Sequence, residues 1–183
     1  MWWGRGSQRQ RSEALAGAPL AREKGEQVAP EVTLRPMNDA EYVGFRTFMD
    51  EDYAQVVARA MDLSIEDARA LAAKQLADLL KNGLATEGHH LWKIMTDHDG
   101  AVGDLWTFVD PAKRTAFIYF IGIDERHRGN GYGKATMLAL EAAVRRQGVS
   151  HIDLSVAGDN TTAIHLYEGV GYRPTAISMR KGL

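Results

Sequence analysis

The chain has 183 residues and a mass of 20.2 kDa; its 22 Lys and Arg against 24 Asp and Glu give a formal net charge of −2 and an isoelectric point near 6.3. With 45% apolar and 25% charged residues, it has the composition of one ordinary globular domain. The balanced charge argues against a protein that coats duplex nucleic acid, and the absence of cysteine excludes disulfides, thiolate metal sites, iron–sulfur clusters and thiol nucleophiles.

The first 30 residues differ in composition from the rest of the chain. Basic residues are interspersed there with Gly, Ser, Gln, Ala and Glu, without an amphipathic period: Arg5, Arg9, Arg11, Arg22 and Lys24. We expect residues 1–30 to form a disordered tail and residues 31–183 to form a single domain. The apolar stretch at residues 14–21 is interrupted by Gly17 and Pro19, which is atypical of a secretory signal, so we expect a cytoplasmic protein. The longest apolar run, residues 116–123, is far shorter than the roughly 18 residues of a membrane span, so no membrane partner is expected.

The folded part is predicted to begin with a short strand and two helices. Residues 32–34 have the pattern of a strand, and Asn38 followed by Glu41 forms a capping-box sequence that predicts the start of the first helix. Ser64 followed by Asp67 predicts the start of a second helix, which ends at Asn82-Gly83. The apolar residues of this helix recur at helical spacing and predict its buried face: Ile65, Ala68, Ala72, Leu76 and Leu79.

Three strands follow in the sequence. Residues 90–96 and 101–109 are β-like runs, and the Asp-His-Asp-Gly sequence at 97–100 predicts a hairpin turn between them. Residues 116–123 are apolar at successive positions, which is typical of a central strand that is covered on both faces.

The last part predicts a helix over residues 131–147, a strand at 152–156, a short helix at 160–168 and a final strand at 172–179. The element order is therefore β-α-α-β-β-β-α-β-α-β. We find no internal repeat and no second domain.

The most informative segment joins the central strand to the helix at 131–147. Glycines alternate at Gly129, Gly131 and Gly133, which allows a ligand to approach the backbone closely, and the first N–H groups of the helix carry a partial positive charge. Arg126, Arg128 and Lys134 add cationic side chains. The segment predicts a binding site for phosphate or pyrophosphate.

Two common phosphate motifs do not fit this spacing. A Walker loop requires glycine five residues before Gly133, where Arg128 stands, and Ser or Thr after Lys134, where Ala135 stands. A dinucleotide fingerprint requires glycine at the position of Lys134, and the 50 residues after Gly133 are too few to complete a doubly wound sheet.

The pattern Arg126-x-x-Gly129-x-Gly131 resembles the acetyl-CoA pyrophosphate motif of the GNAT N-acetyltransferase superfamily. Residues 156–172, with Asn160, a Leu-Tyr pair and a Gly-aromatic pair, resemble the second signature of that family. The resemblance extends over residues 32–181. It implies an α/β (α+β) fold with a mixed, mostly antiparallel sheet of six to seven strands flanked by helices. It also implies a splay between the strands at 117–123 and 152–156, into which acetyl-CoA enters as the co-substrate.

The resemblance further implies which residues contact the cofactor. The pantetheine arm would pair with the backbone at Ile121 and Ile123, the pyrophosphate would lie on the loop, and Asn160 would contact the cofactor from the opposite wall. The implied loop residues are Arg126, Arg128, Gly129, Asn130, Gly131, Tyr132, Gly133 and Lys134.

Family members transfer the acetyl group directly to an amine, so the amine must lose a proton and the thiolate must gain one. The resemblance implies that Tyr167 is the acid, although a buried tyrosine in this context can also be a core residue. The strand at 116–123 carries no carboxylate, where many relatives have a Glu base. Tyr119 and Asp104 are the named candidates; Glu51, Asp52 and a water relay remain open. The six histidines show no metal-ligand spacing, so no metal is expected.

The expected function is an N-acetyltransferase that acts on a primary amine of a small molecule. A protein or peptide amine is the alternative acceptor, and an acyl-CoA-binding sensor without turnover is the non-enzymatic alternative. No nucleic-acid partner is expected, and a homodimer is left open.

Overall fold

The computed structural model describes residues 30–182, so the predicted tail lies outside the described residues except for Pro30. The elements, in chain order, are β1 (Thr33–Pro36), α1 (Asp39–Met61), α2 (Ile65–Leu79), η1 (Gly83–Ala85), β2 (His89–Thr96), β3 (Gly100–Asp110), β4 (Thr115–Ile123), η2 (Glu125–His127), α3 (Tyr132–Arg145), β5 (His151–Leu154) and α4 (Thr161–Gly169). The predicted order is confirmed through α4.

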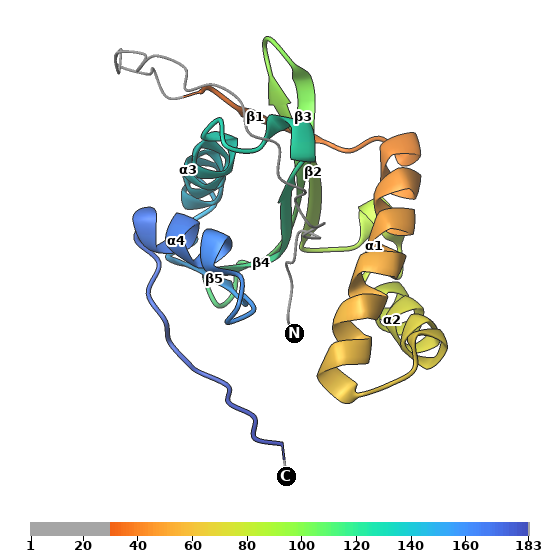
Figure 1. Ribbon diagram of the computed structural model, residues 1–183. Helices are drawn as coiled ribbons and strands as arrows, with labels where there is room; N and C mark the ends of the chain where they lie inside the picture. Colours follow the sequence, from red (N-terminus) through yellow and green to blue (C-terminus); the bar gives the residue numbers. More distant parts are fainter. Residues whose placement is uncertain (1–29, 183) are drawn as a thin grey trace, which may run out of the picture.

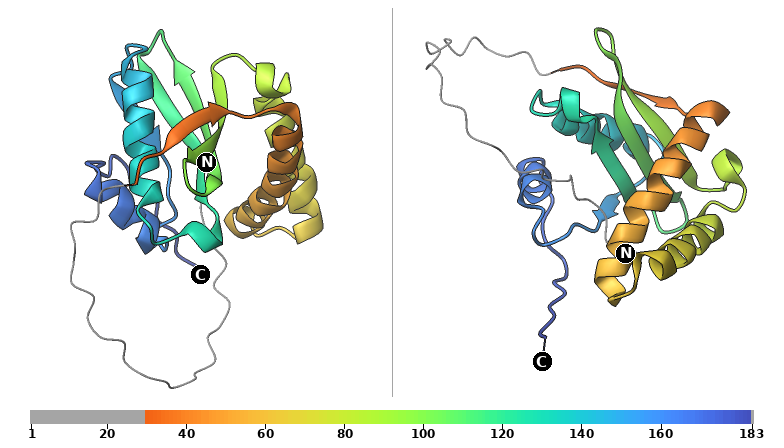
Figure 2. Two further views of the ribbon diagram at one scale, coloured as in Figure 1. Left: turned by 90° about the horizontal axis from the view of Figure 1, so that it is seen from above. Right: turned by 45° about the vertical axis from the view of Figure 1, so that its right-hand side comes forward.

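The strands form one sheet in the order β1-β2-β3-β4-β5. The first four strands are antiparallel to their neighbours, and β5 is parallel to β4. Helices α1 and α2 lie on one side of the sheet, and α3 and α4 lie on the other (Figure 1, Figure 2). The expected mixed, mostly antiparallel α/β architecture is confirmed.

The strand count of six to seven is wrong, because the sheet formed by the described residues has five strands. The predicted strand at residues 172–179 is not formed; beyond Gly171, which has φ +99°, the chain is extended and residues 173–182 are exposed. This segment runs away from the sheet (Figure 1). An extended sequence becomes a strand only where a neighbouring strand supplies ladder hydrogen bonds, and no described strand lies beside it.

Side-chain caps explain where the first two helices begin. The Asn38 side chain accepts the backbone N–H of Glu41, and the Glu41 carboxylate accepts the backbone N–H of Asn38, which is the predicted capping box. The Ser64 hydroxyl accepts the N–H of Asp67 at the start of α2. Both predicted helix starts are confirmed.

The sheet separates two hydrophobic cores. On the α1–α2 side, Trp106 and Met49 are fully buried; on the α3 side, Leu105 and Met137 are fully buried. Neighbouring residues of β3 thus enter different cores because successive strand side chains point to opposite faces. Because both faces of β3 and β4 are covered, these two strands form a rigid support for the turn that follows β4.

Two irregularities open the sheet on the β5 side. The pairing of β4 with β5 covers only Thr115–Ile118 against His151–Leu154, although β4 continues to Ile123. The β3–β4 register shifts where Trp106 pairs with Phe120 and Thr107 pairs with Ile118, so Tyr119 is the extra residue of a β-bulge. The outer edge of β4 from Tyr119 to Ile123 is therefore not paired with β5.

Candidate active site

The turn after β4 exposes backbone N–H groups at the start of α3. Gly129 has φ +78° and Gly131 has φ +82°, a conformation that other residues rarely adopt. Gly131 is the N-cap of α3 and provides no side-chain cap, so the first-turn N–H groups of the helix remain free to bind an anion. A Cβ added at Gly129 would meet open space, which leaves room for a ligand there.

Two polar side chains of this turn are bound to the turn itself. The Nε atom of Arg128 donates to the Ile123 carbonyl at 3.0 Å, and Nδ2 of Asn130 donates to the His127 carbonyl at 3.1 Å. These two predicted cofactor residues therefore also stiffen the loop. Arg126 and Lys134 are exposed at its surface and could meet a phosphate.

The β2–β3 hairpin is attached to this loop through a residue that the sequence analysis missed. The Tyr132 hydroxyl donates to Oδ2 of Asp99 at 2.8 Å, and Nδ1 of His127 lies 3.7 Å from the same oxygen. Asp99 thus contacts residues on both sides of the glycine turn. Only the long-range geometry reveals this role, because Asp99 is an ordinary turn residue in the sequence.

Gly133 has a packing role rather than a conformational one. A Cβ at this position would lie 3.1 Å from Cδ2 of Leu166, so glycine allows α3 and α4 to approach closely. The third glycine of the motif therefore positions α4, the helix that carries Tyr167.

Tyr167 lies in α4 beside the core on the α3 side of the sheet. Burial raises the pKa of its hydroxyl to about 12, so the phenol is protonated at neutral pH. Asn160, the other predicted residue of this region, is the N-cap of α4, and its Oδ1 atom accepts the N–H of Ala163 at 3.1 Å.

The two named base candidates lie on β3 and β4. The Tyr119 ring stacks on Trp106 at a centroid distance of 4.6 Å, and burial raises the pKa of its hydroxyl. Asp104 pairs with Lys93, whose Nζ atom lies 2.6 Å from Oδ1 of Asp104. Burial is the largest influence on this carboxyl group and raises its pKa, while Lys93 acts in the opposite direction.

The structure does not bring all three candidate catalytic residues into contact. Tyr119 packs against the core on the α1–α2 side, whereas Tyr167 packs against the other core. The unpaired part of β4 lies at the boundary between these two sides. Of the other acidic candidates, Glu51 is engaged by two hydrogen bonds from Arg69, each 3.0 Å long.

Within residues 30–182, no group of three His, Cys, Asp or Glu side chains could hold a metal ion. In the same part of the chain, no helix has the length and apolar character needed to cross a bilayer.

The chain is similar in sequence to known acetyltransferases. A model of the acetyltransferase (GNAT) family matches residues 57–172. YycN of Bacillus subtilis (strain 168), described as an uncharacterised N-acetyltransferase, is 36% identical over 154 residues, which cover 83% of this chain and 99% of YycN. A mycothiol acetyltransferase of Beutenbergia cavernae is 35% identical over 94 residues, or 51% of this chain and 31% of that protein.

Solved structures show the same fold. The crystal structure of YycN superposes with a TM-score of 0.77 and covers 83% of this chain and 98% of the YycN chain. Spermidine N-acetyltransferase of Vibrio cholerae in complex with CoA and spermine has a TM-score of 0.52 at 19% identity, covering 77% of this chain and 80% of that one. The second likeness is one of fold alone.

The family match spans more than half of the chain, and the similarity to YycN spans almost all of YycN. The chain therefore belongs to the GNAT acetyltransferase family. It is an N-acetyltransferase by class, and acetyl-CoA is the acetyl donor of that family.

Proposed function

We propose that this protein transfers the acetyl group of acetyl-CoA directly to a primary amine of a small molecule, with both substrates bound at once. The observation that carries the proposal is the glycine turn at the start of α3, which lies at the end of the unpaired part of β4. This arrangement offers main-chain groups for an extended ligand and an anion site at one end of it.

The chain's own residues fit an acyl-CoA in two ways. The N–H groups around Gly129 and Gly131, with the side chains of Arg126 and Lys134, bind the pyrophosphate. The free edge of β4 at Ile121 and Ile123 pairs with the amide groups of the pantetheine arm, as an added strand would.

Tyr167 supplies a proton in this proposal. The amine nitrogen forms a bond to the thioester carbon, the carbon–sulfur bond breaks, and the phenol of Tyr167 protonates the departing sulfur. Its raised pKa keeps the phenol protonated throughout the neutral range, as an acid of this kind requires.

The proton of the amine needs an acceptor, since an alkylamine with a pKa near 10.4 is mostly protonated at pH 7. Asp104 takes this proton, directly or through water, because its raised pKa makes it a stronger base than an exposed aspartate. Tyr119 is protonated at neutral pH and contributes a hydrogen bond rather than a base.

The test is release of free thiol from acetyl-CoA in the presence of polyamines, aminoglycosides, amino acids or N-terminal peptides. We expect one class of small amine to stimulate release in the native chain. Stimulation by peptides alone would transfer the proposal to a protein or peptide amine. Tight binding of acetyl-CoA without stimulation by any acceptor would favour the sensor, and absence of binding would contradict the proposed site.

A further inference from the structure

The ion pair between Lys93 and Asp104 is withdrawn from water. The side chain of Lys93 is 20% exposed and that of Asp104 is 21% exposed, whereas Lys74 and Lys113, which pair with other aspartates, are 73% and 77% exposed. Removing two charges from water costs free energy, and such a pair often stabilises a fold less than apolar side chains of similar size would. The position of this pair therefore points to a role other than stability.

The pair lies on the α1–α2 face of the sheet. Lys93 in β2 and Asp104 in β3 are direct cross-strand partners. Two positions away, the partners Leu91 and Trp106 enter the core on the α1–α2 side, and side chains two positions apart in a strand share a face. On its other side, Asp104 pairs with Gly122, in the part of β4 that is not paired with β5. The carboxylate is therefore one strand away from the edge at which the cofactor is proposed to bind.

Lys93 is the cation that acts most directly on Asp104. Its Nζ atom lies 2.6 Å from Oδ1 of Asp104, an oxygen that is buried and receives no hydrogen bond from any other described residue. The other charged groups that act on this carboxyl group are acidic: Asp124, which follows β4, and Glu41 of α1. Arg35 of β1 is bound to Glu41 by hydrogen bonds of 2.6 and 3.1 Å. The charge of Lys93 therefore offsets both burial and the two acidic neighbours.

These opposing influences leave Asp104 with the properties of a proton acceptor. Burial is the largest influence and raises the pKa of the Asp104 carboxyl group, while Lys93 lowers it. Without Lys93, burial and the acidic neighbours would together favour the neutral carboxylic acid, which cannot accept a proton. With Lys93, the group is held as a carboxylate whose pKa is still above that of an exposed aspartate. A general base must be ionised before the reaction and must still attract a proton.

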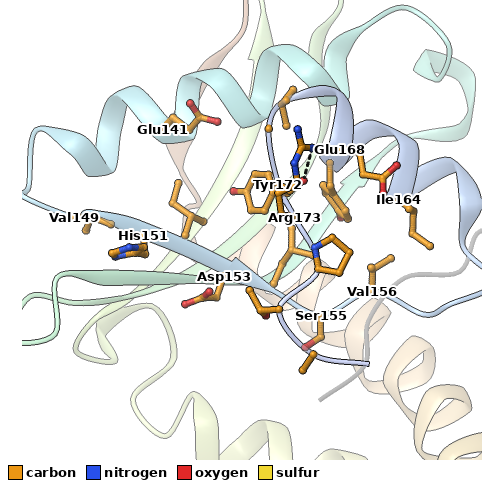
Figure 3. Close-up of a pocket in the computed structure, with 18 of the residues that line it drawn as sticks. Glu141, Val149, His151, Asp153, Ser155, Val156, Ile164, Glu168, Tyr172 and Arg173 are labelled. Carbon is orange, nitrogen blue, oxygen red and sulfur yellow. Dashed lines mark hydrogen bonds between the residues drawn. The ribbon is translucent and has the colours of Figure 1, made fainter. Parts of the chain in front are cut away.

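The acid of the proposed reaction lies on the other side of the sheet. Tyr167 lines a cavity of about 930 Å³ that is bounded by β5, α3, α4 and residues 173–178 of the same chain (Figure 3). Neither Lys93 nor Asp104 lines this cavity. Lys93 can therefore act on the proton acceptor without acting on the proton donor.

We propose that Lys93 is a positioning residue of the acetyl transfer, which fixes the Asp104 carboxylate beside β4 and keeps it ionised at neutral pH. This inference rests on the proposed function, in which Asp104 is the proton acceptor. The ammonium group of the acceptor gives one proton to the Asp104 carboxylate, which becomes a neutral carboxylic acid. The amine nitrogen keeps the electron pair that attacks the thioester carbon, and Lys93 keeps its own proton throughout.

The first experiment follows the Asp104 carboxyl group by carbon-13 NMR titration, and its signal is identified with Asp104→Asn. Lys93→Met should raise the pKa of Asp104 by about 1–3 pH units, because the opposite charge is lost. Lys93→Arg keeps the charge and should leave this pKa near its native value. Lys113→Met is the matched control: Lys113 also pairs with an aspartate, but it is exposed, so its loss should not move the Asp104 titration. An Asp104 pKa that is equal in Lys93→Met and in the native chain would overturn the proposal.

The second experiment measures kcat against pH by thiol release, with the small amine that gives the highest rate in the native chain. We expect kcat to fall as the pH drops through the pKa of Asp104. Lys93→Met should move this fall to higher pH by the same amount as in the titration, with the KM for acetyl-CoA unchanged, and Lys93→Arg should restore the native profile. Lys93→Gln, which keeps a hydrogen-bond donor, replaces Lys93→Met if circular dichroism shows that the latter is unfolded.

Asp104→Asn separates this inference from the proposed function on which it rests. The fall of kcat at low pH should be absent in Asp104→Asn, because the titrating group is gone. A fall that persists in Asp104→Asn would show that Asp104 is not the proton acceptor, and both proposals would be contradicted. A fall that is absent in Asp104→Asn but not displaced in Lys93→Met would leave Asp104 as the proton acceptor and refute only the role of Lys93.

Discussion

Tyr167 and Tyr172 lie side by side, with ring centroids 5.9 Å apart. Only the Tyr167 hydroxyl has a role in the proposed reaction. Burial raises the pKa of both groups. The Tyr172 hydroxyl is buried and has no hydrogen-bond partner among the described residues, which lowers the free energy of unfolding. No step of the proposed reaction uses this hydroxyl. Tyr167 is the acid of the proposed reaction. The pair therefore offers a matched comparison between a proposed catalytic hydroxyl and a neighbouring one.

Substituting Tyr167→Phe should lower kcat by about 10²–10⁴-fold, because it removes one proton donor from the reaction. The KM for acetyl-CoA should change little, since the ring and its packing remain. Steady-state thiol release measures both constants. Tyr172→Phe is the control; it should retain turnover and be equally or more stable, because it removes an unsatisfied hydroxyl. Equal turnover in the two variants would contradict the role of Tyr167.

Glu41 gives a prediction about stability and pH. The pKa of the Glu41 carboxyl group is lowered from 4.5 to about 2. The largest cause is the hydrogen bond from the Arg35 side chain, and the second is the hydrogen bond from the Asn38 backbone. Because the folded pKa is below the unfolded one, the stabilisation is present above about pH 4.5 and is lost as the pH falls toward 2. Glu41→Gln should cost about 1–2 kcal/mol of unfolding free energy at pH 7 and almost nothing near pH 2.

Urea denaturation at several pH values measures this difference. Glu66→Gln is a suitable control, because Glu66 is also in the first turn of a helix but is exposed. A cost for Glu41→Gln that did not vary between pH 7 and pH 3 would show that the charge of Glu41 is not responsible.

At the scale of elements, the β2–β3 hairpin contacts the glycine turn that is proposed to bind an anion. The sequence predicts both parts, yet nothing in the local pattern connects them. The Tyr132–Asp99 hydrogen bond joins residues 33 positions apart and depends on how α3 packs beside the sheet. The proposed cofactor site therefore depends on a tertiary contact as well as on the glycine motif.

The variant Asp99→Asn should raise the KM for acetyl-CoA by about 3–10-fold, the equivalent of losing roughly 1 kcal/mol of loop stabilisation. The chemical step should be unaffected, so kcat should stay near its native value. Tyr132→Phe, which removes the donor of the same bond, should have a similar effect. Asp97→Asn changes a neighbouring turn residue and should leave the KM for acetyl-CoA unchanged. An increase in KM equal to that of Asp99→Asn would show that the negative charge of the hairpin, and not the hydrogen bond to Tyr132, is responsible.

The last element shows where prediction by pattern fails. Residues 172–179 have the composition of a strand, but the sheet of the described residues ends at β5. In contrast, the predicted starts of α1 and α2 are confirmed, because a capping residue acts on N–H groups only three positions away. Local hydrogen bonds can be read from sequence, whereas strand pairing depends on a distant partner.

At the scale of the whole molecule, the two cores share the same sheet. Each core depends on β3, since Leu105 and Trp106 enter different sides. We therefore expect the domain to unfold as one cooperative unit, although its helices lie on separate sides (Figure 2).

This expectation is tested with one substitution in each core. Met49→Ala and Met137→Ala each truncate a fully buried side chain and should cost about 2–5 kcal/mol. Both variants should unfold in a single transition, with coincident curves from circular dichroism and tryptophan fluorescence. Leu138→Ala, at a side chain that is 48% exposed on α3, should change stability by less than about 0.5 kcal/mol. Two separated transitions in either core variant would show that the cores are independent.

The sequence by itself determined the order of elements through α4, the α/β class and the glycine turn before α3, because capping residues, glycines and apolar periods act over a few positions. Only the tertiary structure decided that Tyr119 is the extra residue of the bulge, that Asp99 reaches the glycine turn and that β5 ends the sheet. These features depend on which segments meet in space, and that depends on packing across the entire sheet rather than on any local pattern.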